Sequence, residues 1–216
     1  MTTLAAIAEW IEILGKKNPV QVESKSVDPR EVLRQRYRPA QVRLLFVGEA
    51  PPASGLFFYR ADSGLFRAIR KAFIAAFPAL RSRDFLKSFQ ELECYLVDLC
   101  ATSVDRLDKE ERRRVCLQSE VRLARIIKRL QPKTIITVVR SISPHVERAQ
   151  QQADWTGLHV SLPYPGRWRH HEVAFEKALS PILRRQLSKP AVNALPLSAA
   201  KRTLRASFRL ATLETP

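Results

Sequence analysis

The chain has 216 residues, 45% of them hydrophobic, which suffices for one folded domain with its own core and excludes a chain that is disordered throughout. It holds 37 Lys and Arg against 21 Asp and Glu, and its formal net charge is +16 at pH 7. Such a charge favours polyanionic partners, nucleic acid first, over acidic small molecules. Ribosome-associated proteins, proteins of membrane surfaces and Arg-rich proteomes share this balance.

Expectations about location and bound groups come from what the sequence lacks. No apolar run approaches ~18 residues, so no transmembrane helix is expected. Met1-Thr2-Thr3 lacks the basic start of a signal peptide, and we expect a cytoplasmic, nucleoid-associated monomer that engages no membrane. Cys94, Cys100 and Cys116 are expected to be reduced and buried, and they do not combine with the histidines at zinc-site spacing. The sequence therefore predicts no metal and no cofactor.

In chain order, the hydrophobic pattern predicts alternating helices and strands, which is typical of an α/β domain. The first helix spans 3–15, and a second begins at Asp28-Pro29 and runs to about Arg36. Strands are predicted at 44–47, 93–99, 133–139 and 159–162, and further helices at 62–77, 107–131, 141–150 and 172–187. Residues 81–90 are interpreted as a polar stretch, 1–189 as the domain and 190–216 as a basic, flexible tail.

The turn after the first strand is the main candidate site. The apolar run 44–47 is typical of a buried strand and stops at Gly48-Glu49-Ala50-Pro51-Pro52, where the prolines end the ladder. In open α/β sheets, ligands bind at this carboxyl end. Phe57, Phe58 and Tyr59 follow on a loop, where they either plug the top of the core or face a planar ligand. The cations nearby either clamp phosphates or are simply solvated: Arg60, Arg67, Arg70 and Lys71.

Two later strand ends add candidates. Asp98 ends the second strand and, if that strand is parallel to the first, lies beside the first turn; the alternative is a helix or turn cap. The fourth strand ends in a proline-rich segment whose rings and cations suit an unstacked nucleotide, or else pack at the rim. These residues are Pro163, Tyr164, Pro165, Gly166, Arg167, Trp168 and Arg169. The basic outer face of the helix at 107–131 is interpreted as solvated.

Over residues 40–187 the chain resembles the uracil-DNA glycosylase superfamily in the order of its elements and in three motifs. Residues 48–51 match the family's Gly-Glu-Ala-Pro-Gly turn, with Pro52 in place of the last glycine. Residues 132–136 match its helix–Pro-Lys–strand signature, and residues 162–167 correspond to its minor-groove loop. The resemblance implies a three-layer α/β/α sandwich around a four-stranded, mostly parallel sheet. It also implies flipping of a deaminated base in double- or single-stranded DNA and hydrolysis of its N-glycosidic bond without a cofactor.

The resemblance further implies a role for each motif. Glu49, with the backbone of Ala50 and Pro51, would position the attacking water. An aromatic ring from 57–59, first Phe58 and then Tyr59, would stack on the flipped base. Asp98 falls where the family has its base-reading Asn, and the loop 163–167 would wedge into the duplex.

Three features depart from the family pattern. Leu162 replaces a histidine that supports charge on the departing base, a contribution of about 2–4 kcal/mol in analogous sites, so cleavage is expected to be slow or absent. An ionised Asp98 offers only acceptors, which suits a base edge with two donors or the activation of water. Cys100 and Cys116 are spaced like two iron–sulfur ligands of the family, but no cysteine precedes Cys94, and no cluster is expected.

Two other functions remain for comparison. A nucleic-acid-binding module of the same fold, without cleavage, is favoured by Leu162 and Asp98. A small-molecule α/β enzyme finds little support, because the chain has no G-x-S-x-G elbow, no G-x-G-x-x-G turn and no P-loop.

Overall fold

The structure is a computed structural model that describes residues 28–166 and 168–187. The helix predicted at 3–15, the tail at 190–216 and Arg167 lie outside the described residues.

A four-stranded sheet forms the centre of the fold, with strand order β2-β1-β3-β4 and every strand parallel. Its strands are β1 (Leu44–Gly48), β2 (Cys94–Asp98), β3 (Thr134–Thr137) and β4 (Leu158–Ser161). All residues of β1, β2 and β3 are buried, as expected for a parallel sheet that is covered on both faces. The predicted α/β class is confirmed, and the sheet is wholly rather than mostly parallel.

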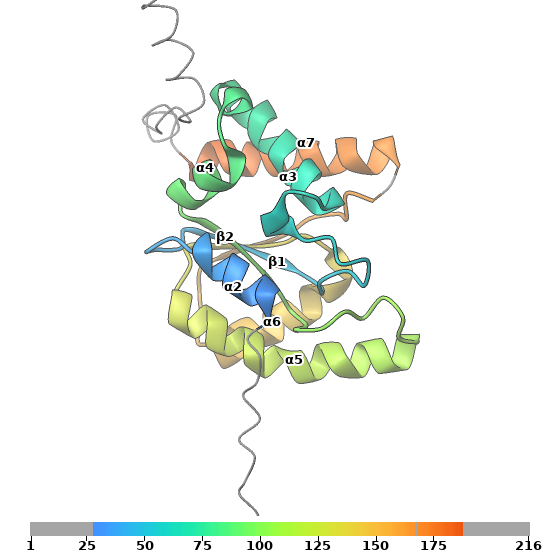
Figure 1. Ribbon diagram of the computed structural model, residues 1–216. Helices are drawn as coiled ribbons and strands as arrows, with labels where there is room; N and C mark the ends of the chain where they lie inside the picture. Colours follow the sequence, from blue (N-terminus) through green and yellow to red (C-terminus); the bar gives the residue numbers. More distant parts are fainter. Residues whose placement is uncertain (1–27, 167, 188–216) are drawn as a thin grey trace, which may run out of the picture.

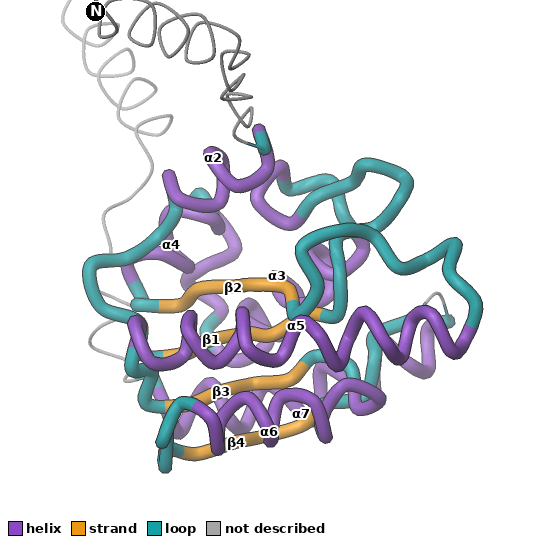
Figure 2. Tube along the Cα trace, turned by 90° about the horizontal axis from the view of Figure 1, so that it is seen from below, coloured by secondary structure: helices purple, strands orange, loops and turns teal. Residues whose placement is uncertain are grey.

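Helices cover both faces of this sheet and complete three layers (Figure 1). One face carries α3 (Gly64–Ala76), α4 (Phe85–Glu91) and α7 (Arg169–Gln186). The other carries α5 (Lys109–Leu130) and α6 (Ser143–Gln152), which lie in front of the strands in Figure 2. The remaining helix, α2 (Pro29–Arg36), lies beyond the outer edge of β2 (Figure 2). The carboxyl ends of β1 and β2 therefore lie between α2, α3 and α5.

The interpretation of residues 81–90 as a polar stretch is wrong, because α4 begins within it. The Asp84 carboxylate caps this helix by accepting from the amide of Lys87 at 3.3 Å. Phe85 and Phe89 are buried and pack on the aromatic ring of Phe73 in α3. A helix of 7 residues is too short to show a clear periodic pattern in the sequence. Its cap and its spacing of two phenylalanines four residues apart were the available signals.

Other predicted bounds shift by a few residues. The predicted strand at 133–139 is shorter in the structure, at Thr134–Thr137, and the last helix begins at Arg169 rather than at residue 172. Short 3₁₀ turns occupy Phe58–Arg60, Pro78–Ser82 and Arg140–Ile142. None of these differences changes the order of the elements.

Candidate active site

Backbone hydrogen bonds join the turn after β1 to the end of β2. Gly48 is in register with Asp98 in this parallel pair. The amide of Leu99 donates to the Gly48 carbonyl at 2.8 Å, and the amide of Cys100 donates to the Glu49 carbonyl at 2.8 Å. The expectation that Asp98 lies beside the first turn is confirmed, because β1 and β2 are parallel neighbours.

A cavity of about 910 Å³ lies at these strand ends, within the range of roughly 300–1,000 Å³ that is typical of ligand sites. Its walls come from the turn after β1, from the aromatic loop and from the loop between β4 and α7. The two proline-rich turns, far apart in the sequence, thus meet at one cavity. The predicted site residues that line it are Glu49, Ala50, Pro51, Phe57, Phe58, Asp98, Tyr164, Pro165 and Gly166.

Asp98 is held by arginines at the wall of this cavity. Its side chain is 9% exposed, and its Oδ2 accepts from Nη2 of Arg34 at 2.7 Å. Arg122 donates from Nη1 to the backbone carbonyl of Asp98 at 2.8 Å. Burial raises the pKa of the Asp98 carboxyl, and the charges of Arg34 and Arg122 oppose that shift. The raised pKa suits a group that accepts a proton during a reaction.

The second oxygen of Asp98 faces the turn after β1. A Cβ atom built on Gly48 would lie 2.8 Å from Oδ1 of Asp98, closer than side-chain carbons approach an oxygen. A glycine is therefore required for the carboxyl to reach this position. Oδ1 has no hydrogen-bond partner among the described residues, and Asp98 lines the cavity.

Glu49 forms a bidentate ion pair with Arg112, which lies near the start of α5. Nε of Arg112 donates to Oε1 of Glu49 at 2.6 Å, and Nη2 donates to Oε2. The Glu49 side chain is 15% exposed. This pairing fixes the direction of the Glu49 carboxylate at the cavity wall.

The three predicted aromatic residues separate into two kinds. Phe57 and Phe58 line the cavity although they are only 2% and 3% exposed, and the Arg34 guanidinium lies 5.3 Å from the centre of the Phe57 ring. Tyr59 turns toward β2 instead, where its hydroxyl donates to the Leu96 carbonyl at 3.0 Å and accepts from the Leu96 amide at 2.7 Å. Tyr59 thus completes the open edge of the sheet and does not line the cavity.

The predicted DNA-binding residues are only partly brought together. Tyr164 is 59% exposed at the cavity, with Pro165 and Gly166 beside it. Trp168 is 68% exposed and, with Arg169, lines a separate cavity of about 730 Å³ at the start of α7. Two predicted residues lie at neither cavity: Pro163 is half-buried and Arg60 is bound to Asp62 and to the Gly55 carbonyl.

Arg34 and Arg112, whose side chains bind the carboxylates of Asp98 and Glu49, were missed from the sequence. Arg34 lies on a short helix, and Arg112 belongs to the face of α5 that was interpreted as solvated. The partners of Arg34 and Arg112 are 64 and 63 residues away, so only the tertiary structure reveals the two ion pairs. A buried carboxylate such as Asp98 needs a cation, and this requirement was the one available signal.

The described part of the chain holds no group of three or more His, Cys, Asp or Glu side chains placed to bind a metal ion. Within the same residues, no helix has the length and apolarity that a bilayer crossing requires. Neither a protein family model nor a curated protein matches the chain. Function is therefore inferred from the residues of the site.

Proposed function

We propose that this protein binds DNA, takes a flipped base into the cavity at the ends of β1 and β2, and hydrolyses the N-glycosidic bond of a damaged, deaminated base. One observation carries the proposal: Glu49 and Asp98, two buried phenylalanine rings and the exposed Tyr164 line the same cavity. Phe57 and Phe58 offer apolar contact to a flat base, and the cavity volume of about 910 Å³ is sufficient for a nucleoside. The resemblance of residues 48–51, 132–136 and 162–167 to motifs of the uracil-DNA glycosylase superfamily also supports the proposal.

The chemistry assigned to the site is a displacement at C1′ of the deoxyribose. A water held at Oδ1 of Asp98 attacks C1′ and gives its proton to the carboxylate, while the bond from C1′ to the base nitrogen breaks. The electron pair of that bond leaves with the base, which takes up a proton from solvent. Glu49, fixed by Arg112, stabilises the positive charge that develops on the sugar.

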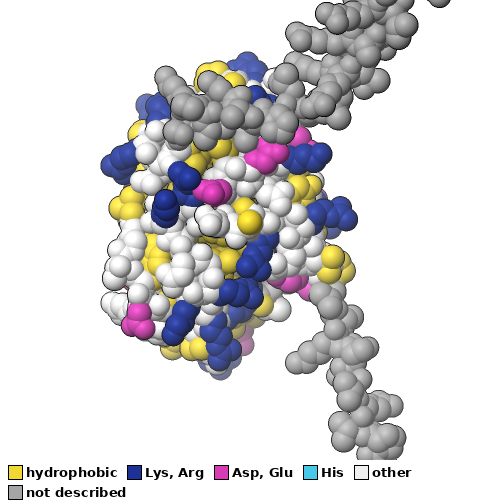
Figure 3. Space-filling model, turned by 90° about the vertical axis from the view of Figure 1, so that its left-hand side faces the viewer, with side chains coloured by type: hydrophobic (Ala, Val, Ile, Leu, Met, Phe, Trp, Pro, Cys, Tyr) yellow, Lys and Arg dark blue, Asp and Glu magenta, His cyan; other side chains and the backbone are white. Residues whose placement is uncertain are grey.

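The basic surface supports a nucleic-acid partner. Figure 3 shows Lys and Arg side chains on the face that lies on the left of Figure 1, which is the side opposite the strand ends that hold the cavity. With a net charge of +16, phosphate contacts are expected to dominate affinity and to make it fall steeply with salt.

A second candidate function is DNA binding without cleavage. Leu162 is 1% exposed and occupies the position of the family's histidine, so its side chain cannot donate a hydrogen bond to a departing base. In this case the cavity would hold an extruded base while the glycosidic bond stays intact.

The test uses the full chain and labelled oligonucleotides that carry uracil, hypoxanthine or xanthine, single-stranded and in duplex. Alkali-labile breaks measure excision, and a filter assay measures binding. We expect Asp98→Asn and Glu49→Gln to lower the excision rate at least a hundredfold while binding stays within threefold. Glu110→Gln, which removes an exposed carboxyl on α5, is the matched control and should leave excision unchanged.

The pH profile adds a second readout. Because burial raises the pKa of Asp98, excision should rise with pH through a value above that of an ordinary aspartate and then level off. If the protein binds the substrates but produces breaks in none of them, the second candidate function, DNA binding without cleavage, is supported. Affinity that does not change with salt would contradict both.

A further inference from the structure

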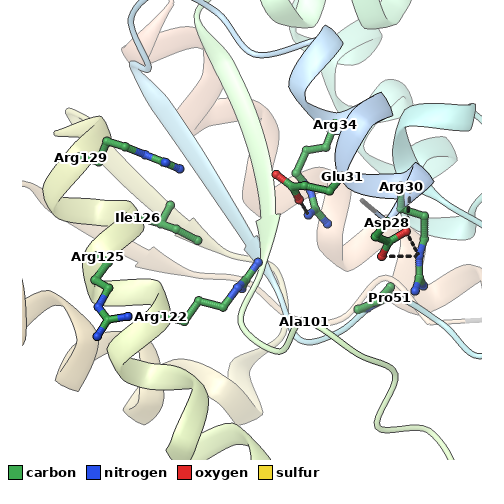
Figure 4. A pocket seen from close by; sticks show the side chains of 10 residues that line it. All are labelled: Asp28, Arg30, Glu31, Arg34, Pro51, Ala101, Arg122, Arg125, Ile126 and Arg129. Carbon is green, nitrogen blue, oxygen red and sulfur yellow. Dashed lines mark hydrogen bonds and ion pairs between the residues drawn. The ribbon is translucent and has the colours of Figure 1, made fainter. Parts of the chain in front are cut away.

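A second cavity of about 520 Å³ lies on the outer side of β2, between α2 and α5 (Figure 4). Five arginines and two carboxylates line it, so its walls are strongly basic. Arg30 and Arg34 come from α2, whereas Arg122, Arg125 and Arg129 come from α5. The cavity is separate from the candidate active site but adjoins it, because Pro51 lines both.

The spacing of the α5 arginines explains how they share one cavity. Arg122, Arg125 and Arg129 are three and four residues apart, so they lie on one face of the helix. Ile126 lies on the same face and adds an apolar surface between them. Arg125 and Arg129 are exposed, as the basic pattern of this helix predicts, and they also form one wall of the cavity.

The charges within the cavity are not balanced by its own acids. Asp28 is paired with Arg30 at 3.3 Å, and Glu31 is paired with Arg34. Arg125 and Arg129, by contrast, have no hydrogen-bond or ion-pair partner among the residues of the described ranges. Two cations are thus available to a ligand without breaking any contact in the protein.

Arg34 and Arg122 approach the carboxyl end of β2 from opposite sides (Figure 4). Arg122 donates to the backbone carbonyls of Asp98 and Leu99 at 2.8 and 3.2 Å, which fixes its guanidinium at the cavity. Burial and the nearby like charge of Arg34 lower the pKa of Arg122. An anion bound beside these two cations would offset their like charges.

We propose that this cavity binds the phosphate of a nucleotide, either free or as part of a strand. Guanidinium groups bind phosphate oxygens two at a time, and five of them line this cavity. A volume of about 520 Å³ is larger than one phosphate needs, and Pro51 and Ile126 offer apolar contact for a sugar or base. The proposal does not depend on base excision, because it concerns a different cavity.

The test compares two double variants of the full chain that remove the same charge from the same helix. Arg125→Gln/Arg129→Gln removes the two unpaired arginines of the cavity, and Lys109→Gln/Arg113→Gln removes two exposed cations at the other end of α5. Thermal unfolding verifies that both variants fold. Calorimetric titration then measures binding of inorganic phosphate, a nucleoside monophosphate and an undamaged single-stranded oligonucleotide at low salt.

We expect the cavity variant to bind the nucleoside monophosphate or the oligonucleotide at least tenfold more weakly than wild type, and the control variant to stay within threefold. If the cavity variant loses affinity for the nucleoside monophosphate, the ligand is a free nucleotide. If it loses affinity for the oligonucleotide alone, the ligand is the phosphates of a strand. Equal affinities of the two variants for all three probes, or no binding of any probe to wild type, would overturn the proposal. Excision by the cavity variant, measured separately, keeps this result distinct from the proposed function.

Discussion

Arg34 and Asp98 form a buried ion pair between α2 and the end of β2, with Nη2 and Oδ2 2.7 Å apart and with side chains 8% and 9% exposed. The pair lies where the two cavities adjoin, since Asp98 lines the candidate active site and Arg34 lines the arginine-rich cavity. The residue assigned to the chemistry is therefore oriented by a residue of the second cavity.

Removing Arg34 is expected to destabilise the fold. Arg34→Ala leaves a buried carboxylate without its cation, which costs about 3–5 kcal/mol in comparable pairs. Folding raises the pKa of the Asp98 carboxyl. The protonated carboxyl therefore contributes stability that is fully present below the unfolded pKa. This stability is lost as the pH rises through the folded pKa. Without Arg34 the pKa rises further. Urea unfolding of Arg34→Ala should therefore show a larger loss of unfolding free energy at pH 7 than at pH 4. At pH 7, the double variant Arg34→Leu/Asp98→Leu should lose less than Arg34→Ala does. Equal losses at both pH values would contradict this.

Gly48→Ala is expected to displace the Asp98 carboxyl. The added Cβ would lie 2.8 Å from Oδ1, and the carboxyl cannot turn away freely while Arg34 holds Oδ2. We expect a stability loss of about 1–3 kcal/mol and at least a tenfold loss of excision. Gly64→Ala is the control, because its Cβ would meet only the end of the Arg67 side chain at 3.9 Å. An unchanged excision rate in Gly48→Ala would argue against the assigned position of Asp98.

Tyr59→Phe is expected to remove the hydrogen-bond partner of the outer edge of β2. The hydroxyl exchanges two hydrogen bonds with the backbone of Leu96, and its removal leaves a buried amide and carbonyl unsatisfied. The expected loss is about 1–3 kcal/mol in the free energy of unfolding. Tyr37→Phe keeps the ring that stacks on Tyr59 at 5.7 Å and should change stability by less than about 0.5 kcal/mol. Equal losses of unfolding free energy in Tyr59→Phe and Tyr37→Phe would contradict the role assigned to the Tyr59 hydroxyl.

Glu120→Gln is expected to weaken the contact between α5 and α6. Burial alone would raise the pKa of Glu120, but hydrogen bonds from Arg148 and His145 lower it. A lowered folded pKa means stability that is present above the unfolded pKa and lost as pH falls through the folded pKa. We expect the variant to lose about 1–3 kcal/mol at pH 7, and the difference from wild type should shrink as pH falls toward 3. A difference that is constant with pH would show that charge plays no part.

The three cysteines are expected to react slowly in the native protein. All are free and buried, and burial raises the pKa of Cys116 to about 12. Burial also raises the pKa values of Cys94 and Cys100. Because the thiolate is the reactive form, alkylation at pH 8 should be at least a hundredfold slower than for a free thiol and should recover in urea. Fast labelling of the folded protein would contradict the burial of these groups.

The sequence by itself determined most of the elements and their order. Apolar runs ended by prolines and glycines predict strands, and amphipathic spacing predicts helices, because both signals depend on neighbours in the chain. The same local reasoning placed Glu49 and Asp98 at strand ends, and the parallel pairing of β1 and β2 then brought them together. The short helix α4 was missed because two buried phenylalanines are too few to define a period.

Only the tertiary structure decided which charges meet. Arg34, Arg112 and Arg122 have the same local appearance as solvated arginines, and their partners lie far away in the sequence. It also separated Tyr59, which completes the sheet edge, from Phe57 and Phe58, which line the cavity. Side-chain pairing depends on distance in space, which hydrophobic periodicity does not encode, and so the arginine-rich cavity could not be predicted from the chain alone.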